Sequence, residues 1–165
     1  MATSAPNDSH TRDGTHPSQM IALAVGIAYT AVGLLGFAVT GFDDFAAHDT
    51  GETLLGFELN PLHNIVHLII GLAGLAMWRT LTSARAYGWA LAIGYGATFV
   101  YGLFAVDEDD INFLSLNQAD NWLHLASTLL GLAAALWPAR DRDERTIDLT
   151  ASNRRRSSTR DQIPS

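Results

Sequence analysis

The chain contains no cysteine and no lysine among its 165 residues. Without cysteine there is no disulfide, no thiolate metal ligand and no cysteine nucleophile, and the redox compartment cannot be inferred from cysteine usage. The sequence also lacks a glycine-rich phosphate loop, a nucleophile motif and a surface that combines basic with aromatic residues. These absences argue against an enzyme and against binding of nucleic acid.

Charge is scarce as well, because only 16% of the residues are charged while 48% are apolar. That balance is rich in apolar residues for a soluble domain, and the length suits one domain. The polar ends, residues 1–18 and 139–165, have no apolar periodicity and are expected to be disordered, the second of them rich in arginine. The two histidines of the first tail, His10 and His16, are assigned no role.

Four apolar runs occupy the middle of the chain, at about 20–42, 61–78, 87–106 and 118–137. A helix of about 20 apolar residues crosses a bilayer. The first run follows a polar leader and so reads as an uncleaved anchor rather than a signal peptide. We therefore predict an all-α fold, a four-span transmembrane helix bundle with its membrane domain at residues 19–138 and a linker at 79–86.

The basic residues are all arginine, and they fall only in the two tails and the linker. The loops at 43–59 and 107–117 are acidic and carry none. By the positive-inside rule, both termini are expected to be cytoplasmic in a multi-pass protein of a bacterial cell membrane. The acidic loops, expected outside, read as solvated segments rather than as cation sites.

The second and fourth runs begin alike, with NPLHNIVHLIIGLAG at 60–74 and NQADNWLHLASTLLG at 117–131. Asn60 and Asn117 are expected N-caps, with Pro61 at the first helical position and Asp120 placed to complete a capping box. A shorter match, ALAVG at 22–26 and ALAIG at 90–94, extends the similarity. The pattern predicts two tandem helical hairpins related by a pseudo-twofold axis along the membrane normal, with the second helix opposite the fourth.

The motifs N-P-L-H-N-x-x-H-L-x-x-G at 60–71 and A-D-N-x-L-H-L at 119–125, set among four apolar runs, resemble a known family. They are similar to actinobacterial integral membrane proteins grouped as domain of unknown function 4383, over roughly residues 20–138. The resemblance implies a four-helix membrane fold and no activity, so it supplies no catalytic residue. The absence of lysine and the abundance of alanine and arginine resemble the composition of proteins from a GC-rich bacterial genome, which is the source that this family implies.

The paired polar residues of the two motifs are the candidate site. Side chains four residues apart share a helix face, so His63 and His67 are expected to face Asp120 and His124. The first interpretation is a structural polar cluster that includes Asn60, Asn64, Asn117 and Asn121. In it, side chains hydrogen-bond across helices, and Asn64 or Asn121 is the expected partner of each imidazole.

Three alternatives stay open for the same residues. Zinc or another divalent transition metal suits a set of three imidazoles and a carboxylate, here His63, His67, Asp120 and His124. A haem held by His67 and His124 is the second, and a proton or ion path is the third. The sequence thus favours a structural or accessory membrane protein without a cofactor, with metal or ion handling as the alternative. The expected partners are the lipid bilayer, a second copy of the chain or other membrane proteins.

Overall fold

The computed structural model describes residues 14–48 and 51–138. Its elements are α1 (Pro17–Thr40), β1 (Thr53–Leu54), β2 (Phe57–Glu58), α2 (Pro61–Met77), α3 (Leu81–Ala105) and α4 (Gln118–Leu136). The all-α prediction is confirmed, with four helices in the described residues. The expected disorder of residues 1–13 and 139–165, and His10 with it, lies outside the described part of the chain.

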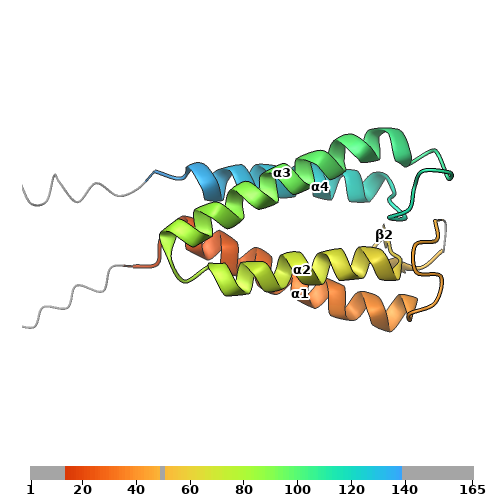
Figure 1. Ribbon diagram of the computed structural model, residues 1–165, viewed down its shortest axis with the longest axis horizontal. Coiled ribbons are helices and arrows are strands. Elements are labelled where there is room, and N and C mark those ends of the chain that lie inside the picture. The colour runs from red at the N-terminus through yellow and green to blue at the C-terminus, as the bar shows by residue number, and fades with distance from the viewer. Residues whose placement is uncertain (1–13, 49–50, 139–165) are drawn as a thin grey trace, which may run out of the picture.

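The helices lie lengthwise beside one another in two pairs (Figure 1). Helix α1 packs chiefly against α2, and α3 packs chiefly against α4, with smaller contacts between the pairs. The start of α1, the link from α2 to α3 and the end of α4 lie at one end of the molecule (Figure 1). We refer to the opposite end, which carries residues 41–60 and 106–117, as the loop end.

Helices α2 and α4 begin at the two predicted caps. The side-chain oxygen of Asn60 accepts from the backbone amide of His63 at 2.8 Å. Asn117 accepts from the amides of Ala119 and Asp120, and the Asp120 carboxylate accepts in return from the Asn117 amide. Both N-cap predictions and the capping box are confirmed, because these bonds satisfy amides that a helix leaves unpaired in its first turn.

Two helices, α1 with 24 residues and α3 with 25, are long and apolar enough to cross a membrane. Helix α2 is apolar but has only 17 residues. Helix α4 has 19 residues, and its first turns contain Asp120, Asn121 and His124. Length and composition therefore support membrane association through α1 and α3.

Two predicted boundaries at the other end are wrong. Helix α3 begins at Leu81 rather than near 87, since Thr80 caps it by accepting from the Ser83 amide and no proline or glycine interrupts residues 81–86. Helix α1 begins at Pro17, inside the predicted tail. His16 forms a capping box with Gln19, and its ring also bonds the Pro138 carbonyl oxygen at 3.0 Å. His16 thus has a structural role that its place in a polar segment hid.

The segment predicted as a plain loop at 43–59 contains a short hairpin. Thr53 pairs with Glu58, and Leu54 pairs with Phe57. The two turn residues, Leu55 and Gly56, both have positive φ, at 57° and 90°. Such a turn matches the twist of the strands, and glycine at its second position is the signal that was available. The hairpin lies between α1 and α4, where it covers their loop ends.

Glycines bring the paired helices close together. A Cβ added at Gly26 would lie 2.8 Å from the Leu75 nitrogen, and one at Gly74 would lie 2.8 Å from the Gly26 Cα. In the other pair, a Cβ at Gly88 would lie 2.8 Å from the Gly131 oxygen. Small residues that allow such approach are typical of helices packed in membranes, where lipid offers no hydrophobic drive for association.

Candidate functional site

A layer of buried polar side chains crosses the bundle near the loop end. Each is at most 2% exposed, and they are Asn60, His63, Asn64, His67, Asp120, Asn121, His124 and Ser127. Buried polar groups are normally hydrogen-bonded, because leaving one unpaired costs about 1–3 kcal/mol. The partner of each side chain therefore indicates whether that residue serves the fold or something else.

Asn60 and Asn117 bind across the two helix pairs. The Nδ2 of Asn60 donates to the Phe113 oxygen in the α3–α4 loop and to the Ala47 oxygen, both at 2.9 Å. The Nδ2 of Asn117 donates to the Gly56 oxygen in the α1–α2 loop, also at 2.9 Å. Each asparagine thus caps its own helix with oxygen and holds the opposite loop with nitrogen.

Asn64 and Asn121 lie against glycines of the neighbouring helix. A Cβ at Gly36 would collide with the Asn64 Oδ1, and a Cβ at Gly102 would collide with the Asn121 Oδ1. The Asn64 Nδ2 donates to the Thr40 Oγ1 at 2.9 Å. The expected bridge from Asn64 to a histidine is therefore wrong. Gly36 has no side chain, so the Asn64 amide fits against α1 and bonds Thr40 there.

The structure brings His63, His67 and His124 together. The ring centroids of His63 and His67 lie 4.4 Å apart, and those of His63 and His124 lie 6.3 Å apart. Asp120 differs, since its Oδ2 accepts from the Asn117 amide. Asp120 therefore acts as part of a helix cap and makes no bond to an imidazole.

Two tyrosines, which sequence reasoning missed, complete the layer. Tyr29 of α1 and Tyr95 of α3 stack with ring centroids 5.3 Å apart. Tyr29 also lies 5.0 Å from the His67 ring, and Tyr95 lies 5.3 Å from the His124 ring. The available signal was the occurrence of tyrosines in otherwise apolar runs. The resulting cluster joins aromatic and imidazole rings from all four helices.

His67 stands apart from the rest of the layer. It is 2% exposed, and neither of its ring nitrogens has a hydrogen-bond partner among the described residues. In His63 and His124 the Nδ1 atom is also buried without a partner among the described residues. A neutral imidazole carries one donor and one acceptor, so His67 leaves both capacities unused. The two nitrogens of His67 therefore add no hydrogen bond to the stability of the fold.

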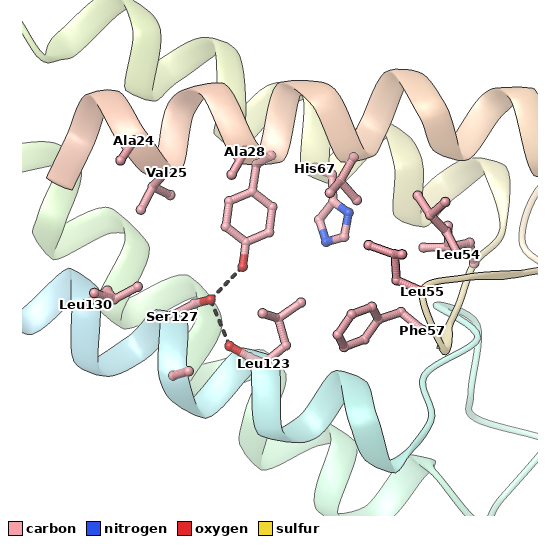
Figure 2. Close-up of a pocket in the computed structure, with 14 residues that line it drawn as sticks. Ala24, Val25, Ala28, Leu54, Leu55, Phe57, His67, Leu123, Ser127 and Leu130 are labelled. Carbon is pink, nitrogen blue, oxygen red and sulfur yellow. Dashed lines mark hydrogen bonds between the residues drawn. The ribbon is translucent and has the colours of Figure 1, made fainter. Parts of the chain in front are cut away.

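Two cavities adjoin the ring cluster. The larger, about 370 Å³, lies between α1 and α4 and reaches the hairpin at one end (Figure 2). Its walls include Tyr29, His67 and Ser127. The smaller, about 130 Å³, lies between α2 and α3 and is lined by all three clustered histidines. His67 lines both cavities. The imidazoles therefore have free volume beside them on two sides of the bundle.

The four predicted metal ligands do not all converge on one point in the structure. Within residues 14–48 and 51–138, no three His, Asp or Glu side chains are grouped so that they could hold a metal ion. Asp120, the fourth member of the predicted ligand set, is engaged at its helix start. A metal held by His63, His67, Asp120 and His124 stays a prediction, and it requires the side chains to rearrange.

Comparison with known proteins gives a family but no activity. No curated protein and no solved structure matches the chain. The model of one protein family, described as a domain of unknown function (DUF4383), matches residues 19–137. That match includes all of α2, α3 and α4 and almost all of α1. The chain belongs to the DUF4383 family.

Proposed function

We propose that this chain is a four-span membrane protein with a structural or accessory role, not an enzyme, whose polar layer fixes the arrangement of its helices. Helices α1 and α3 have the length and apolar composition of membrane spans. Helices α2 and α4 lie along them as packing partners, so the axes of all four helices would cross the bilayer together (Figure 1). Arginines in the sequence of both tails and in the link from α2 to α3, together with acidic loops that carry none, favour a cytoplasmic location for both termini.

We further propose that the two helix pairs are tandem copies of one hairpin. Asn64 over Gly36 and Asn121 over Gly102 are matching contacts. The number of residues from Gly36 to Gly102 also separates Tyr29 from Tyr95. These contacts support a pseudo-twofold relation between α1–α2 and α3–α4.

The ALAVG and ALAIG match is not in this register. It aligns Gly26 with Gly94, yet Gly26 lies against α2, whereas a Cβ at Gly94 would have nothing within 4 Å. Gly26 contacts Gly74, and the corresponding contact in the other pair is between Ala92 and Gly131. Ala92 lies two residues before Gly94 in α3. Apolar segments rich in Ala, Leu and Gly give short matches by composition alone, so the polar contacts are the better guide.

The observation that carries the structural role is the reciprocal bonding of Asn60 and Asn117. Each bond joins the start of a helix in one pair to the loop of the other pair. Interhelical polar contacts in membrane proteins contribute about 0.6–2 kcal/mol each. Two such bonds, together with the Asn64 bond to Thr40, fix the loop end of a bundle whose remaining contacts are largely apolar.

Reporter fusions test this proposal. A reporter after Ser165 and another after Arg79 are expected to register as cytoplasmic, and one inserted within residues 43–48 as external. The linker reporter serves as the control, because two spans precede it just as four precede Ser165. An external signal at Ser165 would overturn the four-span arrangement.

Metal binding is the second candidate, and one observation favours it. His63, His67 and His124 line the same 130 Å³ cavity, and each has at least one unpaired ring nitrogen. Imidazole nitrogen is a good ligand for zinc and related metals. Elemental analysis of the protein purified in detergent tests this candidate, which requires one metal ion per chain.

A further inference from the structure

We infer that the 370 Å³ cavity between α1 and α4 binds a bilayer-soluble alcohol, with the apolar body in the cavity and the hydroxyl group on His67. The inference rests on the proposed membrane placement, since such a ligand enters from lipid between the two helices. It assigns a role to a buried imidazole whose two ring nitrogens both lack a hydrogen-bond partner among the described residues.

The cavity has the size and lining of a small-molecule site. Pockets for such ligands typically have volumes of about 300–1,000 Å³ and mostly apolar walls. Here small and aliphatic side chains from both helices form the sides, namely Ala24, Ala28, Val32, Leu123, Ala126 and Leu130. Mostly apolar walls offer few hydrogen-bond partners to water. An apolar molecule is therefore the occupant that the walls favour.

Three side chains contribute polar atoms to this cavity, and two of them satisfy each other. The hydroxyls of Tyr29 and Ser127 are 2.5 Å apart, and Ser127 donates to the Leu123 oxygen at 2.8 Å (Figure 2). His67 has neither ring nitrogen paired and lies with its ring among the lining side chains (Figure 2). A ligand that reaches His67 would remove the cost of an unpaired buried imidazole.

The smaller cavity shows that the large volume is not a necessary result of the fold. It lies in the matching position between α2 and α3, with Tyr95 in place of Tyr29 and Ile70 in place of Ser127. By the spacing that relates Asn64 to Asn121, Ile70 and Ser127 are corresponding residues. Isoleucine is bulkier than serine, and the space that Ile70 lines measures about 130 Å³ against about 370 Å³ for the space beside Ser127.

The hairpin supplies the outer wall of the cavity. Leu54, Leu55 and Phe57 all line it (Figure 2). Leu55 has a φ of 57° in the turn, where asparagine, aspartate or glycine is usual. A leucine in this conformation is strained, and such strain often accompanies a functional requirement. In this structure Leu55 contributes to the rim of the cavity, while 87% of the residue stays exposed.

The chemistry of the anchor selects the head group. A neutral imidazole pairs through either a donor or an acceptor nitrogen, and a hydroxyl matches both. The cavity walls carry no Arg, Asp or Glu, so a charged head group would lack a counter-ion. An uncharged alcohol satisfies His67 without placing a charge among apolar walls.

Photolabelling in lipid nanodiscs tests the inference. The probes are decanol and decane that carry the same diazirine, at equal mole fraction in the lipid. We expect decanol to label residues of α1 and α4 at the cavity about fivefold more than decane does, the factor a single hydrogen bond provides. His67→Leu should remove this preference. Ser127→Ile, which narrows the cavity as Ile70 does opposite, should reduce cavity labelling by both probes.

Leu129→Ile is the matched control, because Leu129 is on α4, is 58% exposed and does not line the cavity. Labelling spread evenly over exposed side chains, and unchanged by Ser127→Ile, would overturn the cavity as a site. Equal labelling by the two probes in the parent chain would overturn the role of His67. Topology reporters separate these results from failure of the proposed function: a four-span result without cavity labelling counts against the ligand alone.

Discussion

Asn60 and Asn117 perform the same two tasks from opposite helix pairs. Each accepts a backbone amide of its own helix with its side-chain oxygen, and each donates from its side-chain nitrogen to the loop of the other pair. The accepting carbonyls, of Phe113 and Gly56, are separated by as many residues as the two asparagines.

Substitution with serine separates capping from the bond across the pairs. Serine is a good N-cap, but its side chain is too short to reach the opposite loop. We expect Asn60→Ser and Asn117→Ser each to lower the free energy of unfolding by about 1 kcal/mol, with alanine costing about 1 kcal/mol more. Thermal unfolding in detergent measures this. Serine variants as stable as the parent would remove the cross-pair bonds from the structural proposal.

Alanine at Gly36 or Gly102 is expected to destabilise the bundle. The added methyl group would overlap the Oδ1 of Asn64 or Asn121, and relieving such overpacking costs about 1–3 kcal/mol. Gly94→Ala is the matched control, since it lies on α3 with open space at its Cβ position and should not destabilise the helix.

The cause can be isolated with a second substitution. Gly36→Ala combined with Asn64→Ala should lose less stability than the sum of the two single changes, because the clash is then absent. Additive effects would show that Gly36 is not required by Asn64.

Leucine at His67 is expected to stabilise the protein in detergent without an added ligand. The change removes two buried nitrogens that have no hydrogen-bond partner. Each of them costs free energy in the folded state, so their removal should raise the free energy of unfolding. Asn64→Leu, by contrast, breaks the bond to Thr40 and should destabilise by about 1–3 kcal/mol. A loss of stability in both variants would mean that His67 forms a stabilising bond that the structure lacks.

Chelation distinguishes the structural proposal from the metal candidate. If the polar layer is structural, zinc and chelator should leave thermal unfolding of the parent unchanged. Should a metal bind, chelator would lower the unfolding temperature, and His63→Gln, His67→Gln and His124→Gln would each abolish that shift. Asp120→Asn discriminates further. If Asp120 acts only as a cap, this variant should keep the metal-dependent shift.

The sequence by itself determined the features that depend on neighbouring residues. Asn60 and Asn117 were recognisable as helix starts because a cap bonds to amides two or three residues away. The apolar runs likewise indicated the helices. The start of α3 at Leu81 was missed, because the charge of Arg85 suggested a linker, whereas the Thr80 cap and the absence of breakers allow a helix there.

The tertiary structure decided how the polar residues are paired. Asn64 turns to Thr40 because Gly36 leaves room on α1, and Tyr29 meets His67 because the close approach of glycines sets the helix register. These pairings depend on contacts between residues far apart in the chain. The spacing of side chains along one helix predicts which of them share a face, but not which residue of another helix they contact. The cavity beside His67 arises in the same way, from small side chains on α1 and α4 that face each other only after the helices pack.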